Sequence, residues 1–155
     1  MTPVLKRHIR TFINLWPPML GAGIRVKRFD PDWRTVEVEL RLRFWNSNFV
    51  GTHYGGSLYS MADPFYMLML IENLGDGYIV WDKSATIRFR RSGKGTVRAT
   101  FRLEEEQIEQ IRRALTTEEK TEPVLLVEIK DASGAVVAEV EKVLSVRKKA
   151  VATSA

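Results

Sequence analysis

The 155-residue sequence contains no cysteine and only two histidines, His8 and His53. Without cysteine, the chain has no disulfide bond, no thiolate metal ligand and no cysteine nucleophile. Two histidines are too few for a histidine-rich metal site, so we expect no metal. No apolar run approaches the roughly 20 residues needed to cross a bilayer, so we expect no membrane span. The opening residues lack the apolar core and cleavage site of a signal peptide, which makes a cytoplasmic protein the default expectation.

The remaining composition is that of an ordinary globular protein, with 45% hydrophobic and 28% charged residues. At this length we expect a single domain over residues 1–155, without a linker or an internal repeat. The net charge of +5 has two interpretations: a polyanionic ligand, or a modest excess of solvated lysine and arginine side chains. The composition keeps both open.

The first part of the chain predicts a helix followed by two strands. Residues 3–16 place apolar side chains on one side of a short helix, and the proline pair at 17–18 ends it. We therefore expect residues 1–20 to form an N-terminal helical extension. Alternation predicts a strand at 24–26 and, after a turn, a long strand at 35–44. The apolar face of this long strand comprises Val36, Val38, Leu40, Leu42 and Phe44.

The last part predicts two strand pairs around a helix. Residues 78–104 alternate twice around Ser-Gly-Lys-Gly, which predicts a hairpin of two long strands. Residues 104–120 predict a helix between these later strands. Its apolar stripe comprises Ile108, Ile111 and Leu115. Residues 122–149 predict a second hairpin that turns at Asp-Ala-Ser-Gly, and 150–155 a frayed tail.

Residues 55–73 are almost wholly apolar, and a helix of this kind must be covered on all sides. A curved antiparallel sheet wrapped around this long central helix meets that need, which predicts an α+β fold. A second subunit would cover the sheet edge and the remaining helix face, as a homodimer or a dimer-of-dimers tetramer. One carboxylate, Asp63, interrupts the apolar run, and an unpaired buried carboxylate is costly.

Two explanations of Asp63 stay open. Aspartate followed by proline is a signature of a helix start, so Asp63 would cap a helix that begins at Pro64. Alternatively, the carboxylate is functional and Pro64 kinks a continuous helix. The two coexist if a kink at this position exposes the carboxylate.

Residues 48–63, Asn-Phe-Val-Gly-Thr-His-Tyr-Gly-Gly-Ser-Leu-Tyr-Ser-Met-Ala-Asp, resemble the hotdog-fold thioesterase superfamily. The likeness is to its phenylacetyl-CoA thioesterase-like members and to an uncharacterised thioesterase-like subfamily. In that family an asparagine precedes Gly-Thr, His-Gly-Gly opens the central helix, and an aspartate follows on it. Here Tyr54 stands at the family's histidine, and His53 stands one residue earlier. The resemblance covers about residues 24–147 and implies an acyl-CoA thioesterase with no cofactor, coenzyme A being part of the substrate.

The resemblance implies three catalytic residues: Asp63, Asn48 and Gly56. Asp63 would be the general base for water or, alternatively, a nucleophile that forms an anhydride, and burial in an apolar helix would raise its basicity. Asn48 would hold the attacking water or the thioester oxygen. The Gly56 N–H would hold the thioester oxygen, because the first N–H groups of a helix lack intrahelical partners. Alternatively, the glycines only form the turn into the helix. The resemblance also implies that Asp63 of one subunit faces Asn48 and the Gly-Gly turn of its neighbour.

Further residues are candidates for substrate binding. His53 and Tyr54 are expected at the pocket rim, and Gly55 would let a substrate approach the backbone closely. We expect Asp82 to pair with Lys83; the alternative is a second carboxylate near Asp63.

A basic cluster comprises Arg88, Arg90, Arg91 and Lys94. The resemblance places this region near the phosphates of coenzyme A, and guanidinium groups suit phosphate well. The alternative is an edge strand protected by charge. We expect no nucleic-acid surface, because the cluster is short and no aromatic residues interleave with it.

The sequence thus supports two functions. The first is hydrolysis of a fatty-acyl or aryl-acyl thioester of coenzyme A by Asp63-assisted attack of water. The second is a non-catalytic acyl-CoA or fatty-acyl binding module, which the exchange at Tyr54 and the Asp63-Pro64 pair favour. A dehydratase would require His53 as its catalytic histidine.

Overall fold

The computed structural model describes residues 3–149, with side chains from residue 6 onward. The helices are α1 (Pro3–Leu15), α2 (Pro17–Ala22), α3 (Gly55–Ser60), α4 (Phe65–Leu74) and α5 (Glu105–Thr117). The strands are β1 (Ile24–Phe29), β2 (Thr35–Arg41), β3 (Tyr78–Phe89), β4 (Thr96–Arg102), β5 (Lys120–Thr121), β6 (Val124–Lys130) and β7 (Val136–Lys148). The expected tail at 150–155 lies outside the described residues. Within them, every helix is too short or too polar to cross a lipid bilayer.

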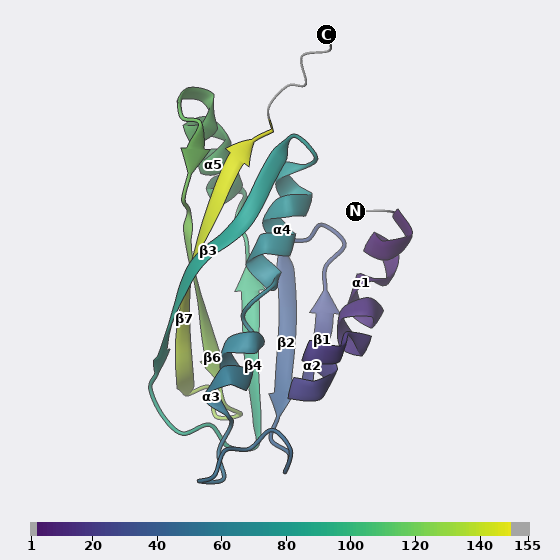
Figure 1. Cartoon of the computed structure of the whole chain (residues 1–155), viewed down its shortest axis with the longest axis vertical. Coiled ribbons are helices and arrows are strands. Elements are labelled where there is room, and N and C mark those ends of the chain that lie inside the picture. The colour runs from purple at the N-terminus through teal and green to yellow at the C-terminus, as the bar shows by residue number, and fades with distance from the viewer. Residues whose placement is uncertain (1–2, 150–155) are drawn as a thin grey trace.

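All strands join one antiparallel sheet in the order β1-β2-β4-β6-β7-β3, with β5 also paired to β7. Helices α3 and α4 lie across one face of this sheet, and α1 and α2 lie beside β1 at one edge (Figure 1). The α+β class and the antiparallel sheet around a central helix are therefore confirmed.

Several local predictions are also confirmed. Helix α1 ends at Leu15, and Pro17 begins α2, in keeping with the preference for proline in the first helical turn. Helix α5 buries its predicted apolar stripe. Strands β6 and β7 form the predicted hairpin around Asp131–Gly134, where Gly134 has φ +84°.

The hairpin predicted for residues 78–104 is wrong. Both strands exist, but β3 pairs with β7 at a sheet edge, whereas β4 lies between β2 and β6. Strand β4 buries Val97, Ala99 and Phe101 on one face, while most of β3 is exposed or only partly buried. The apolar face of β4 thus favours the centre of the sheet, and the connecting residues cross β6 and β7 to reach it.

The strand predicted at 35–44 is shorter than expected, since β2 ends at Arg41 and the Phe44 side chain is 88% exposed. Buried Asn46 explains this end. Its side-chain oxygen accepts a hydrogen bond from the Arg43 N–H at 2.7 Å, and its amide nitrogen donates to the carbonyl groups of Arg41 and Ala22. These bonds turn the chain away from the sheet.

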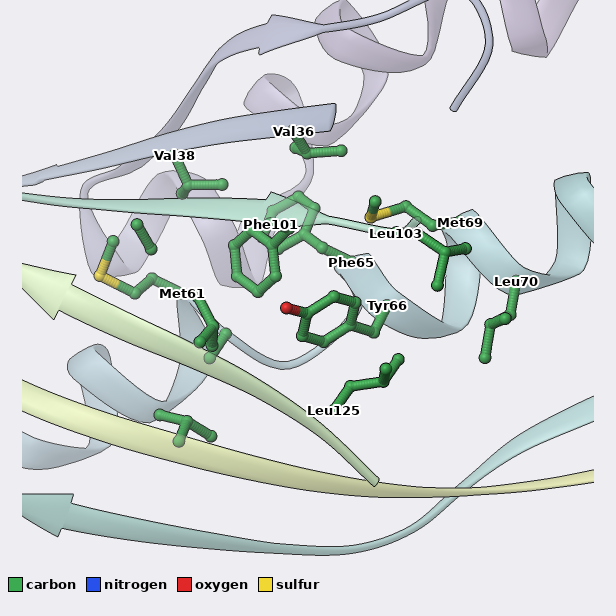
Figure 2. Close-up of a cluster of buried hydrophobic side chains, with 14 of the residues drawn as sticks. Val36, Val38, Met61, Phe65, Tyr66, Met69, Leu70, Phe101, Leu103 and Leu125 are labelled. Atoms are coloured by element: carbon green, nitrogen blue, oxygen red, sulfur yellow. The ribbon is translucent and has the colours of Figure 1, made fainter. Parts of the chain in front are cut away.

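The core forms where α4 packs onto the sheet (Figure 2). Phe65 is fully buried, and its ring centroid lies 4.9 Å from that of Phe101 on β4. Tyr66 also contacts Phe101, and its hydroxyl donates a 2.6 Å hydrogen bond to the Leu126 carbonyl on β6. Helix α4 is therefore held to two strands of the sheet by burial and by one directed bond.

The central helix consists of two segments, α3 and α4, because the helical hydrogen bonding changes before Pro64. The N–H groups of Ala62 and Asp63 donate to carbonyls only three residues back, at 2.8 and 3.3 Å, and proline has no N–H to continue the series. Pro64 itself occupies the N-cap of α4, which has no side-chain capping bond. The capping explanation of Asp63 is therefore wrong, and a kink at this position is confirmed.

Candidate functional site

Asp63 lies at the break between α3 and α4, and its side chain is 50% exposed in the single chain. The expectation that it is buried is wrong here, because the kink turns this residue out of the apolar helix face. Its Oδ1 atom accepts a hydrogen bond from Lys142 Nζ at 3.2 Å. A carboxylate with a bonded cation on one side and solvent on the other can accept a proton from a water molecule.

Lys142 is on β7, and its side chain is only 1% exposed. Besides Asp63, its ammonium nitrogen lies 3.2 Å from Oδ1 of Asp82 on β3, and 5.7 Å from the centroid of the Tyr59 ring. The predicted pairing of Asp82 with Lys83 is wrong, since Lys83 pairs with Glu122. The alternative holds: Asp82 is a second carboxylate near Asp63, with the shared ammonium between them.

These charges have opposing effects on one another. Burial lowers the pKa of Lys142, but attraction by Asp82 and Asp63 outweighs burial, so the pKa lies above its ordinary value and the amine stays protonated. Burial raises the pKa of Asp82, and Lys142 opposes that rise. Burial also raises the pKa of Tyr59, which keeps the phenol neutral. The cluster therefore contains one cation and two carboxyl groups on the sheet face that carries α3.

The start of α3 forms a second group. The Ser57 and Leu58 N–H groups donate to the Tyr54 carbonyl, whereas those of Gly55 and Gly56 have no hydrogen-bond acceptor among the described residues. The Tyr54 ring lies where a side chain on Gly56 would project, and a Cβ on Gly55 would lie 3.0 Å from the Phe89 ring. Glycine at both positions thus leaves room for the Tyr54 and Phe89 rings.

Asn48 organises the loop before α3. Its amide nitrogen donates to Thr52 Oγ1 at 2.8 Å and to the His53 carbonyl at 3.4 Å. Its side-chain oxygen accepts from the N–H groups of Val50 and Thr52. Within one chain, therefore, the amide of Asn48 is engaged in loop structure rather than facing Asp63.

His53 is buried rather than at a surface rim, whereas Tyr54 is exposed. The His53 Nε2 lies 3.1 Å from the Gly95 carbonyl, which fixes the proton on Nε2, and its Nδ1 is buried with no hydrogen-bond partner in the described part of the chain. The His53 N–H also donates to the Gly93 carbonyl at 3.0 Å. His53 thus attaches the loop before α3 to the connection between β3 and β4.

Lowering the pH from about 7.5 to about 5.5 should reduce the melting temperature of the wild type more than that of His53→Gln. Burial lowers the pKa of His53, with the Gly95 bond opposing, so the folded chain binds this proton less readily than the unfolded chain. The contribution of neutral His53 to folding stability is fully present above the histidine pKa of the unfolded chain, about 6.5. It is lost as the pH falls towards the lower pKa of the folded chain. Calorimetry at both pH values measures the difference; equal losses in the two proteins would contradict it.

The basic cluster lies at the same end of the sheet as the start of α3, since residues 90–95 pass beside the loop that holds His53. Arg88, Arg90, Arg91 and Lys94 are all exposed. Arg90 pairs with Glu139 at 2.7 Å, whereas the other three form no ion pair among the described side chains. Three cations are thus available beside the α3 start.

The predicted site residues consequently form two groups within one chain. Asp63 and Asp82 meet through Lys142, which the sequence analysis missed, while Asn48, His53, Tyr54, Gly55 and Gly56 meet at the α3 start. Among the described residues, no hydrogen bond or ion pair connects Asp63 with Asn48 or Gly56.

Three solved structures share this architecture. PA5026 from Pseudomonas aeruginosa, described as a protein of unknown function and "probable thioesterase", is 26% identical, with 96% of this chain and 97% of that chain covered and a TM-score of 0.79. The thioesterase HI1161 from Haemophilus influenzae is 14% identical, with 96% and 94% covered and a TM-score of 0.66. PaaI from the phenylacetic acid degradation operon of E. coli is 17% identical, with 92% and 91% covered and a TM-score of 0.63. The last two show the fold alone.

These likenesses and the strand order define a hotdog-fold protein, as the sequence resemblance predicts. The chain belongs to the family described as domain of unknown function DUF4442, whose sequence model matches residues 6–146. No curated protein matches the chain significantly.

Proposed function

We propose that the protein is a homo-oligomeric thioesterase that hydrolyses a fatty-acyl or aryl-acyl thioester of coenzyme A. The observation that carries this proposal is the Asp63 carboxylate, half exposed at the α3–α4 break and hydrogen-bonded to a buried cation. The 26% identity to a protein described as a "probable thioesterase" supports it.

Asp63 acts as the general base in this proposal. It takes a proton from water as the water oxygen attacks the thioester carbonyl carbon. Collapse of the tetrahedral intermediate breaks the C–S bond, and the coenzyme A thiolate receives the proton from Asp63. The free N–H of Gly56 stabilises the developing oxyanion, and Asn48 orients the water or the carbonyl oxygen.

A second copy of the chain completes the site, because Asp63 does not contact Asn48 or Gly56 of its own chain. Strand β3 supports this arrangement: it is a 12-residue strand at the edge of the sheet, with Trp81 and Phe89 exposed. An exposed edge strand with apolar side chains is a template for pairing with another chain. Pairing about a two-fold axis brings two sites to one interface, and a tetramer would join two such dimers.

The test is release of free thiol from short, medium, long and aryl acyl-CoA substrates, followed with a thiol reagent. Saturable turnover with at least one class supports the proposal and identifies the acyl group. Absence of turnover across the panel, in protein that calorimetry shows to be folded, would overturn it.

Replacing both Arg91 and Lys94 with alanine should raise KM for an acyl-CoA about three- to tenfold and leave kcat nearly unchanged. The reason is the loss of two charged donors to phosphate, each contributing about 0.3 to 0.7 kcal/mol at an exposed, solvent-screened site. KM for the matching acyl-pantetheine, which lacks the nucleotide, should not change. Arg113→Ala on α5 is the control, since Arg113 is also exposed and α5 lies at the opposite end of the sheet from α3 (Figure 1). An equal rise for both substrates would contradict phosphate binding.

A non-catalytic acyl-CoA binding module is the second candidate, and two observations favour it. The Asn48 amide is occupied within its own loop, and the Tyr54 ring covers Gly56, so both need a rearrangement before they act on a substrate. Saturable calorimetric binding of an acyl-CoA without thiol release would favour this candidate.

A further inference from the structure

Lys142 is the most deeply buried charged side chain of the candidate site, and the reaction proposed above does not use it. Its side chain lies on the buried face of β7, between those of Val140 and Leu144. Its cross-strand neighbours are Leu125 on β6 and Ala85 on β3, so its surroundings along the sheet are apolar. A cation in such a place is tolerated only when it is paired.

Three side chains, each from a different part of the fold, face the Lys142 ammonium. These groups are Asp63 from the α3–α4 break, Asp82 from β3 and the ring of Tyr59 from α3. Of the three N–H donors of the ammonium group, one is hydrogen-bonded to Asp63, while Asp82 and the Tyr59 ring lie close to the charge. At 1% exposure, Lys142 itself is closed to a substrate.

The two carboxylates are not equivalent. Asp63 accepts a hydrogen bond from Lys142, whereas Oδ1 of Asp82 lies at the same distance of 3.2 Å but outside hydrogen-bond geometry. This Asp82 oxygen is buried and has no hydrogen-bond partner among the described residues. Asp82 is also the more buried side chain, with 26% exposure against 50% for Asp63. The more exposed carboxylate, Asp63, thus accepts the hydrogen bond from Lys142 and faces solvent. The more buried one, Asp82, supplies a negative charge beside the ammonium.

We propose that Lys142 and Asp82 are positioning residues: Lys142 orients the Asp63 carboxylate for proton transfer, and Asp82 keeps the buried ammonium paired. Lys142 fixes one oxygen of Asp63 and leaves the other for water. When Asp63 takes up the proton of the attacking water, it loses its charge, and Asp82 remains as the counter-ion of the buried ammonium. The proton then leaves with the coenzyme A thiol and the starting charges are restored. This inference rests on the proposed function for its catalytic part, but the Lys142–Asp63 coupling does not.

The central test compares Asp82→Asn with the double variant Lys142→Met/Asp82→Asn. The double variant removes cation and counter-ion together and substitutes an apolar side chain of similar length, so no unpaired charge stays buried. We expect its kcat to fall at least tenfold with KM changed less than threefold. The acidic limb of its kcat/KM profile should move to higher pH, because Lys142 is hydrogen-bonded to Asp63 and Asp82 is not, so the loss of the cation outweighs the loss of the second carboxylate. In Asp82→Asn the acidic limb of the kcat/KM profile should move to lower pH, because a negative charge near Asp63 is lost while the Lys142 cation stays.

Shifts of the acidic limb in opposite directions distinguish a positioning role from a loss of structure. A loosened fold would lower the activity of both variants without moving their acidic limbs in opposite directions. A measurement independent of catalysis follows the Asp63 carboxyl carbon by NMR titration in ¹³C-aspartate-labelled protein, assigned with Asp63→Asn. The same two opposite displacements are expected there. If Asp63→Asn leaves hydrolysis intact but the NMR displacements appear, the coupling stands and the role of Asp63 as base fails. Unchanged pH limbs and unchanged NMR titration in both variants would overturn the proposal.

Discussion

Replacing Asp63 with asparagine is expected to lower kcat for thioester hydrolysis by about 100- to 10,000-fold, the usual contribution of a general base. The amide has nearly the same shape and can still face Lys142, but it cannot accept a proton from water at neutral pH. KM should change little, because the acyl chain and coenzyme A do not depend on this charge. Thiol release with the best substrate of the panel measures both constants.

Asp76→Asn is the matched control for this variant. Asp76 follows the end of α4, is exposed, and forms no ion pair among the described side chains, so its loss should leave kcat within twofold of wild type. Thermal unfolding and gel filtration should show both variants folded and in the wild-type oligomeric state. Full activity of Asp63→Asn under these conditions would assign the base to another group.

The sequence predicted best those elements whose pattern is local. Helix α5 follows from an apolar stripe with acids in its first turn, and the β6–β7 hairpin follows from two alternating runs joined by a four-residue turn with glycine at its left-handed position. Each of these features depends on residues that are close together in the chain.

Strand pairing over longer distances was not predictable in the same way. Residues 78–104 contain two alternating runs joined by Ser-Gly-Lys-Gly, which is also how a hairpin would appear, yet β3 and β4 lie three positions apart in the sheet order. Alternation gives the buried face of a strand but not its partner. The depth of burial is the missing information: β4 is central, and β3 is an edge strand.

The candidate site was half predicted for a similar reason. The motif at 48–63 located Asp63 and the α3 start, whereas Lys142 lies 79 residues further along and meets Asp63 only in the folded chain. One local signal was nevertheless present. In β7 the buried phase runs through Ala138, Val140, Lys142, Leu144 and Val146, so a lysine occupies an apolar position of a clear alternation. A charge in that phase predicts a buried partner of opposite sign.

Replacing Phe65 with alanine is expected to lower the free energy of unfolding by about 3 to 5 kcal/mol, a large part of the 5 to 15 kcal/mol typical of a domain. Phe65 is 0% exposed at the first turn of α4, and its ring packs against Phe101. The loss combines the apolar surface no longer buried with the cavity left in a closely packed core. Urea unfolding at a fixed protein concentration measures it, with the m-value reporting whether unfolding exposes the same surface.

Phe44→Ala removes the same side-chain atoms from a position that is 88% exposed, and should change stability by less than about 0.5 kcal/mol. The pair also tests how the core supports the site, because Phe65 lies two residues after Asp63, on the helix whose packing fixes the break. We therefore expect Phe65→Ala to lower kcat at temperatures where it is still folded, but less than Asp63→Asn, since the carboxylate and Lys142 remain. Similar destabilisation by both phenylalanine variants would mean that the exposed loop around Phe44 is covered in the oligomer, and that its apolar side chains belong to a subunit interface.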